Sequence, residues 1–526
     1  MTDQRPEGTS LARSVKRGVA WSTITFGLSK ALAFISLLVL TRVLAPSQFG
    51  VIGAIVTVLG LIEVNSDLGM KATVVFEQEK DIGERVQTAF TVNVLIAAVL
   101  ALAMFLAAPL VAGFFHARGH TGLFRLAAAD ILLTGLGGIH DGLLLRDLRF
   151  RTRIVTEVVG ALARTGVGIA LALLGFGAAS LVWAMIAGTI VWAAFQWALT
   201  PFRPRFRLDL GIARSMMAYG LGASMLSVVH QIELQVDPAA VGRVLGQRAL
   251  GLYTVAFRVP TLVLENIAYQ VSLVAFPALA RKRVTDAAGI GASTHRLIRY
   301  QALYALPLAA GMAVEAKPIV ETLFSAKWLD AAGVFAAVAI LSGISATTFP
   351  LGDAFKALGR QRTMVLLTML DFPLLVGTIV VAAPLGITAV AWVRAAGELF
   401  WSALMTVTAA RVLGVSVGGT LSAIWPGAVA AAGAAGGAGA VRLWSGLSAI
   451  PQIAAATLVG SLTALLALAV LAPEMFTEVR EAATTLGRRI RPRAPGQPLA
   501  PDALPAVPRE DVSTSGSHAG QEEGSS

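Results

Sequence analysis

The stretch TRVLAPSQFG at Thr41–Gly50 returns in altered form as GRVLGQRALG at Gly242–Gly251. The letters RVL and the closing glycine align between the two copies at a constant offset of 201 positions. In a chain of 526 residues, this pattern predicts an internal duplication. The composition of the chain indicates what kind of structural unit is duplicated.

The composition is that of a membrane protein. The chain is 56% hydrophobic and 14% charged, with a mean hydropathy of +0.73, whereas soluble domains carry about 25% charged residues. Apolar runs of about 20 residues recur, and each is long enough to cross the ~30 Å hydrocarbon layer as a helix. Each span must be helical to satisfy its own backbone. We therefore expect an all-α polytopic membrane protein.

The apolar runs predict about 14 transmembrane helices in two parallel six-helix lobes around a central cavity, followed by two further helices. We place the lobes at 19–200 and 214–410, the linker at 201–213 and the two extra helices at 411–472. Residues 1–18 are expected in the cytoplasm, as is a largely disordered tail at 473–526. The expected spans are 19–41, 49–69, 87–112, 123–145, 154–175, 178–200, 214–236, 249–279, 297–324, 331–352, 362–383, 386–410, 420–441 and 449–472.

The basic residues predict the orientation. With the N-terminus in the cytoplasm, about 30 basic residues fall inside and about 7 outside, as the positive-inside rule requires. Both termini are therefore expected in the cytoplasm. The net charge of +11 is explained by short loops that face anionic lipid, so no nucleic-acid partner is expected. The outer basic residues are Arg42, Arg118, Arg125, Arg243, Arg248, Lys327 and Arg442.

Short motifs in a fixed order carry a family resemblance over residues 15–410. They are TRVLAPSQFGVIG, SDLGM, LLLRDLRFR, VGRVLGQRALGLYTVAFRVP, FPALAR, KPIVETLFSAKW and ALGR. Together they resemble the polysaccharide transporter family, the O-antigen and exopolysaccharide flippases of the multidrug/oligosaccharidyl-lipid/polysaccharide exporter superfamily. Ser325 stands where that family usually has glycine. The resemblance implies that the chain flips polyprenyl-diphosphate-linked oligosaccharide from the cytoplasmic to the outer leaflet by alternating access.

Charged residues inside the spans are the candidate site, because each costs at least ~2.5–3.5 kcal/mol to insert. Cations suit a diphosphate, and arginine can bind phosphate with two parallel hydrogen bonds. The candidate substrate-binding cations are Lys30, Arg164, Arg258 and Arg394.

Intramembrane carboxylates could hold these cations or bind a coupling H⁺ or Na⁺. The spacings Glu157–Arg164, Arg258–Glu265 and Arg394–Glu398 place each pair on one helix face. Each pair could equally be structural, because buried ion pairs are weak evidence of function. The candidate carboxylates are Glu157, Glu265, Glu398, Asp130 and Asp371.

Two related functions stay open: a lipid II flippase, which also has 14 helices, and a cation-coupled multidrug exporter. An enzyme is not expected, because every outer loop is short. We expect no metal and no cofactor: the chain lacks cysteine, His116 and His120 would need a third ligand, and no nucleotide-binding P-loop motif is present. The expected location is the bacterial inner membrane, with polysaccharide polymerase machinery as a possible partner. The glycan is not encoded in any motif.

Overall fold

The computed structural model describes residues 27, 29–66, 70–76, 83–285, 289–477 and 480. The basic cluster Arg13, Lys16 and Arg17 and most of the expected tail lie outside the described residues. Contacts divide the chain into residues 1–475 and 476–526, and the arrangement below is that of the first unit. In the described part of this unit the regular structure is helix alone, as the composition predicts, with an extended linker at 200–209 and short connections elsewhere.

The first half of the chain forms helices at the expected places, within a few residues. A helix covers 29–43, the described part of the first predicted span. It is followed by α2 (Pro46–Ser66), α3 (Met70–Phe76), α4 (Gly83–Phe114), α5 (Thr121–Arg146), α6 (Phe150–Leu173) and α7 (Ala178–Leu199). Together we call them the N-terminal set.

The start of the second half has two helices with a turn between them, as expected from the spans 214–236 and 249–279. Both helices lie within α8 (Leu210–Pro260), which is interrupted at Gly246. A π-helical turn, η2 (Thr261–Glu265), and α9 (Asn266–Thr285) follow, so the second expected span is itself divided. The chain direction changes at Gly246, with φ 81° and ψ −172°. A single glycine makes the turn, because it can adopt positive φ at little cost.

The remaining helices follow the predicted order with one further correction. The span expected at 297–324 is divided at Glu315 into α10 (Ile290–Val314) and the short α11 (Ala316–Phe324). After η4 (Ala326–Ala331) come α12 (Ala332–Ala357), α13 (Gln361–Ala382), η5 (Ala383–Leu385) and α14 (Ile387–Leu413). Helices α8 to α14 are the C-terminal set. The chain continues with α15 (Val417–Trp444) and α16 (Ala449–Leu471).

Ten helices in the described residues are long and apolar enough to cross a membrane. One of them, Val229–Arg283, runs through the turn at Gly246. The apolar part of α2, Pro46–Ile62, is shorter, and α14 is not among the ten. The structure therefore confirms an all-helical, multi-pass membrane protein, while the count of 14 spans stays a prediction.

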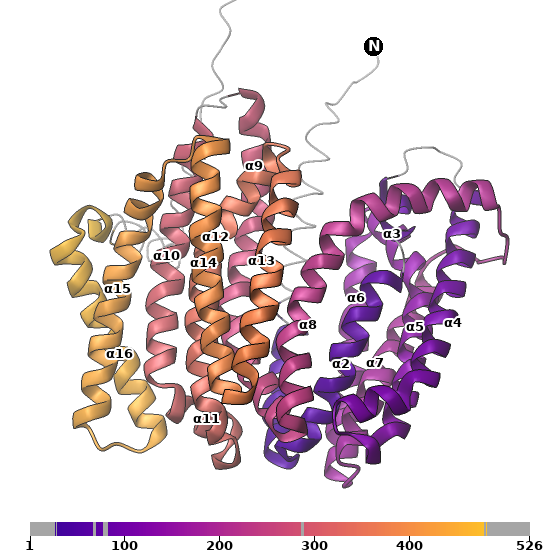
Figure 1. Ribbon diagram of the computed structural model, residues 1–526, viewed down its shortest axis with the longest axis horizontal. Helices are drawn as coiled ribbons and strands as arrows, with labels where there is room; N and C mark the ends of the chain where they lie inside the picture. The colour runs from indigo at the N-terminus through magenta and orange to yellow at the C-terminus, as the bar shows by residue number, and fades with distance from the viewer. Residues whose placement is uncertain are drawn as a thin grey trace, which may run out of the picture. The chain divides into compact units, whose positions relative to one another are not determined.

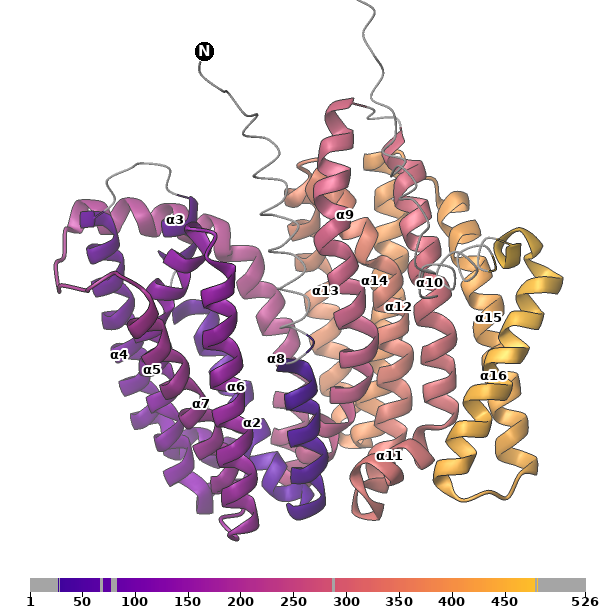
Figure 2. The same ribbon diagram turned by 180° about the vertical axis from the view of Figure 1, so that it is seen from behind.

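Helix α8 connects α2–α7 with the other helices of the C-terminal set. Figure 1 shows its first part lying across the ends of α4 to α6 and its second part running down beside α2, with α9 to α14 on the other side and α15 and α16 beyond α10; Figure 2 shows the same order from behind. Helices α2 and α8 pack along each other more extensively than any other described pair. At Gly433 and Gly437, α15 approaches Thr463 of α16 closely, as a Gly-x-x-x-Gly spacing predicts.

The repeated stretch lies at the crossing of α2 and α8. A Cβ on Gly50 would overlap the carbonyl oxygen of Gln247, and a Cβ on Gly251 would overlap that of Pro46. Under the offset of 201, Gly251 is equivalent to Gly50 and Gln247 is equivalent to Pro46, so the two contacts are equivalent to each other. Such paired contacts are those of an interface with a two-fold axis. This geometry supports duplication as the origin of the repeat.

Candidate functional site

Three of the four predicted cations lie near one another, although they come from three different helices. Lys30 is on helix 29–43, Arg164 on α6 and Arg258 on α8, and Arg258 is within electrostatic range of both others. The side chains of Arg164 and Arg258 are exposed, and Arg258 lies within the apolar run Val229–Arg283. We call Lys30, Arg164 and Arg258 the cationic cluster.

Local packing explains how Arg164 reaches this position. Its Cβ would lie 2.8 Å from a Cβ placed on Gly188 of α7, so only glycine lets α7 pass so closely behind the arginine. Asp130 of α5 is 4% exposed, and Arg164 is among the charges that act on it. The base of the Arg164 side chain thus lies against α7, and its charge is within electrostatic range of Asp130 on α5 and of Arg258 on α8.

The fourth predicted cation, Arg394 of α14, lies elsewhere. Its electrostatic neighbours include Asp237, Glu233 and Glu398, and it also acts on Asp371. Among the described residues, Arg394 therefore lies among carboxylates from α8, α13 and α14, where His230 of α8 is a second basic group, with its Nδ1 3.6 Å from Oε2 of Glu233. The spacing along one helix predicted its face, but not which residues of other helices would surround it.

Two neutral hydroxyl groups complete this acidic cluster. The hydroxyl of Tyr253 donates to Oδ2 of Asp237 at 2.7 Å. The hydroxyl of Ser342 donates to Oε1 of Glu265 at 2.6 Å, and Glu265 acts electrostatically on Glu398. We call Glu233, Asp237, Glu265, Asp371 and Glu398, together with Arg394, the acidic cluster.

Two of the helix-face pairings do not form among the described residues. Glu157 pairs with Arg153 at 2.9 Å, one turn earlier on α6, and not with Arg164. Glu265 is bonded to Ser342 and not to Arg258. A spacing of seven residues puts two side chains on one face but about 10 Å apart along the axis, so nearer partners win. Arg394 and Glu398, four residues apart, remain electrostatic neighbours.

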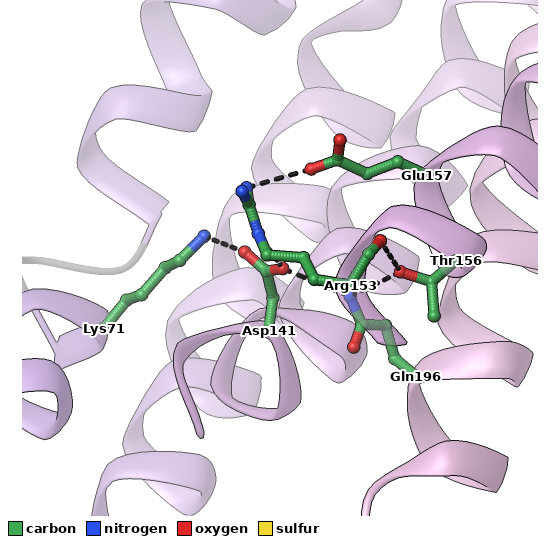
Figure 3. Close-up of polar contacts among 6 residues, drawn as sticks. All are labelled: Lys71, Asp141, Arg153, Thr156, Glu157 and Gln196. Atoms are coloured by element: carbon green, nitrogen blue, oxygen red, sulfur yellow. Dashed lines mark hydrogen bonds and ion pairs between the residues drawn. The ribbon is translucent and has the colours of Figure 1, made fainter. Parts of the chain in front are cut away.

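A third cluster, at the ends of α3, α5, α6 and α7, is centred on Asp141 (Figure 3). Asp141 is 4% exposed and forms ion pairs with Lys71 and, at 2.8 Å, with Arg153. The amide of Gln196 lies 3.3 Å from Oδ1 of the same carboxylate. One buried carboxylate thus joins four helices of the N-terminal set, and its cations are already neutralised. We interpret this cluster as structural.

The C-terminal set has a similar buried aspartate near the end of α12. Asp353 is 3% exposed and accepts a hydrogen bond of 2.5 Å from Ser272 of α9. Lys356 is its electrostatic neighbour. Each set therefore has a buried aspartate that holds a neighbouring helix.

The sequence analysis missed several residues of these clusters. Asp237 precedes Pro238 inside a predicted span, so its position alone could have indicated it. Lys71 and Gln196 lie at helix ends, where polar residues are common, and no signal in the sequence distinguishes them. In the described residues, no group of three or more His, Asp or Glu side chains is placed to hold a metal ion.

Comparison with known proteins identifies the family of this chain. The family described as "Polysaccharide biosynthesis protein" matches residues 39–333. The chain belongs to this family. The match includes both copies of the repeated stretch and six of the seven motifs that carry the resemblance, so the resemblance to polysaccharide transporters is confirmed.

Three curated relatives are similar over about two thirds of the chain. "Teichuronic acid biosynthesis protein TuaB" of Bacillus subtilis is 24% identical over 354 residues, 67% of this chain and 73% of that protein. "Succinoglycan biosynthesis transport protein ExoT" of Rhizobium meliloti is 24% identical over 338 residues, 63% and 67% of the two chains. "Lipopolysaccharide biosynthesis protein WzxC" of Escherichia coli is 21% identical over 354 residues, 67% and 71%.

Two solved structures share the fold. "Lipid II flippase MurJ, inward closed conformation" has a TM-score of 0.73 at 13% identity, covering 86% of this chain and 99% of that one. "Inward-facing conformation of a multidrug resistance MATE family transporter of the MOP superfamily" has a TM-score of 0.59 at 15% identity, covering 73% and 94%. At such low identity the likeness establishes the transporter fold alone.

Proposed function

We propose that this protein moves polyprenyl-diphosphate-linked oligosaccharide across the membrane, from the cytoplasmic to the outer leaflet, for cell-surface polysaccharide synthesis. The family and the transporter fold support transport over catalysis. The observation that carries the proposal is the cationic cluster, because a diphosphate must be neutralised before it can leave water.

Lys30, Arg164 and Arg258 are the proposed binding groups. Arg258 lies within range of two like charges, and no ion pair involving Arg164 or Arg258 occurs among the described residues. Holding the like charges of Arg164 and Arg258 close together is unfavourable unless an anion lies between them, and Asp130 acts on Arg164 alone of these two. A diphosphate supplies that anion, and each guanidinium offers planar paired donors for it.

The acidic cluster has the opposite charge and a different proposed role. Five carboxylates lie around Arg394, so its single positive charge does not balance their combined negative charge. The site could therefore bind one additional cation. We propose that a coupling cation, H⁺ or Na⁺, binds here and couples its own movement to transport. No three of the described carboxylates are placed to hold a metal ion, so the arrangement favours H⁺ over Na⁺. The segregation of the two signs between clusters would allow anion and cation to bind at once.

The proposed location is the bacterial inner membrane, with both termini in the cytoplasm. The multi-pass helical fold and the membrane-transport relatives support a membrane location, and the basic loops support the orientation. Polysaccharide polymerase machinery is the proposed partner on the receiving side, because the flipped oligosaccharide must be extended there.

Two alternatives share the fold. A lipid II flippase would also need cations for a diphosphate, and the MurJ likeness keeps it open. A multidrug exporter would favour acidic groups for cationic drugs, and the acidic cluster is the observation in its favour. The family match favours polysaccharide precursors over both.

The direct test is flipping in proteoliposomes. A fluorescent polyprenyl-diphosphate oligosaccharide in the inner leaflet should reach the outer leaflet faster with this protein than with an Arg258→Ala variant of equal abundance. Lipid II and a cationic dye serve as competing substrates. Transport of either one, without transport of the oligosaccharide, would favour the corresponding alternative.

A further inference from the structure

A pseudo-two-fold axis passes through the crossing of α2 and α8 and relates the two copies of the repeated stretch, in agreement with their reciprocal contacts. Gly53 and Thr254 are equivalent under the offset of 201, and a Cβ on Gly53 would lie 3.0 Å from Oγ1 of Thr254. Two equivalent residues can touch only where the axis of a two-fold passes. The Gly50–Gln247 and Gly251–Pro46 contacts therefore flank that axis.

Small residues line the face of α2 that meets α8. Gly50, Gly53, Thr57 and Gly60 follow one another at intervals of three or four residues, which places them on one helix face. A Cβ on Gly60 would meet the side-chain amide of Gln235 at 2.8 Å. At its Arg42 end this face closes by contact between backbones, which leaves no space for a side chain.

The first copy of the repeated stretch also contacts the C-terminal set beyond the crossing. Arg42 donates through Nη2 to the carbonyl of Thr322 at 3.0 Å. Its own carbonyl accepts from Nζ of Lys327 at 2.9 Å. Trp328, which is fully buried, donates from Nε1 to the carbonyl of Thr41 at 2.9 Å. The first copy is thus fastened to the segment after α11.

The second copy contacts the N-terminal set in return. The amide of Gln247 donates to the carbonyl of His116 at 2.6 Å. The guanidinium of Arg243, the equivalent of Arg42, lies 5.4 Å from the ring centroid of Phe114. The first copy therefore docks on the end of α11 and the residues after it, and the second copy on the end of α4 and the residues after it, so the two halves exchange their contacts.

We infer that Gly50 and Gly251 are positioning residues of transport: they allow the two sets to close, backbone against backbone, at the Arg42 end. A lipid transporter must seal one side before the other opens, and contact between backbones leaves no path for water or ions. This inference rests on the proposed function only for the meaning of the closure; the closure itself can be measured without substrate.

The test uses a single cysteine at Thr57→Cys in this cysteine-free chain. Thr57 is 2% exposed and faces the crossing, so a membrane-impermeant thiol reagent added outside should label it only while α2 and α8 are apart. Gly50→Ala and Gly251→Ala should each raise the labelling rate, by about tenfold, because the added methyl overpacks the closed state. Reciprocity predicts that the two increases are similar and that the double variant shows less than their product.

Matched controls separate closure from a general effect of alanine. Gly166 of α6 and Gly377 of α13 lie inside helices with open space around a Cβ, so Gly166→Ala and Gly377→Ala should leave labelling unchanged. If a crossing variant does not accumulate, Arg42→Ala and Gln247→Ala remove one bond from each copy at exposed or half-exposed positions, and each should raise labelling severalfold.

The outcomes distinguish this inference from the proposed function. Unchanged labelling in the crossing variants, or an increase in only one of the two, would overturn the reciprocal closure even if oligosaccharide flipping is confirmed. Increased labelling in both, with no oligosaccharide flipping by the unmodified protein, would retain the closure and reject the substrate. The positioning role itself requires that Gly50→Ala and Gly251→Ala both lose transport, and that changing each alanine back to glycine restores transport.

Discussion

Arg258→Ala should separate binding from structure, because the charges that act on Arg258 among the described residues are those of the cations Arg164 and Lys30. If a diphosphate joins the cationic cluster, the variant loses a charge-assisted hydrogen bond worth about 1.5–3 kcal/mol. Since every 1.4 kcal/mol is tenfold, the apparent affinity should fall about 10- to 100-fold. Stability should hold or rise, because one like charge leaves the cluster.

Arg394→Ala is the matched comparison and should behave in the opposite way. It would leave five neighbouring carboxylates without their internal cation. Removing one partner of a buried charge pair costs about 3–5 kcal/mol, so this variant should accumulate poorly or melt at a lower temperature. Arg258→Lys should be intermediate in transport, because lysine keeps the charge and loses the paired donors.

The assay combines two measurements on the same preparations. Flipping rates in proteoliposomes over a range of substrate concentrations give KM and kcat, and thermal unfolding in detergent gives stability. Normal flipping by Arg258→Ala would refute its role in binding. A large fall in the melting temperature with Arg258→Ala would show that the cluster is structural.

The remaining predictions concern orientation, closure, the Asp141 cluster and pH. Reporters active only outside the cytoplasm should stay silent when fused within Arg146–Arg153 or after Pro473; activity at either site would break the predicted topology. A disulfide between Ser47→Cys and Gln247→Cys, across the outer ends, should stop transport until it is reduced. A pair at Arg149→Cys and Lys356→Cys, across the cytoplasmic ends, should link only when the cytoplasmic side closes, and this link should also stop transport. Asp141→Asn should cost about 1–3 kcal/mol of stability in detergent, less than a fully buried pair because Lys71 and Arg153 are about a third exposed, while exposed Asp147→Asn should change little. Burial raises the pKa of the Glu315 carboxyl at the junction of α10 and α11, against the opposing effects of Gln452 and Arg442. The folded state thus favours its protonated form, stability should fall as pH rises from the usual carboxyl range through the raised pKa, and Glu315→Gln should flatten this dependence in melting experiments.

The fold class and most helix positions could be predicted from the sequence. Long apolar runs leave helix as the backbone structure that lipid permits, so periodicity and length were enough. The repeated stretch also predicts that the chain is duplicated, and the order of the motifs predicted the family that the family match confirms. These properties follow from local chemistry or from recurring letters, and both are visible without coordinates.

Only the tertiary structure decided which charges share a site. Lys30, Arg164 and Arg258 come from three helices far apart in the chain, and nothing in their local sequence separates them from Arg394. The same holds for Glu157, which pairs with Arg153 and not with Arg164. A helix face is a property of spacing, whereas a neighbour depends on how the helices pack.

The contacts of the repeated glycines are likewise visible only in the packed structure. The sequence gives Gly50 and Gly251 as equivalent letters, but only the crossing places each against the backbone of the other copy. The physical reason is distance along the chain. Residues 201 positions apart can constrain each other only after the chain has folded and brought the two backbones so close that only the hydrogen atom of a glycine fits between them.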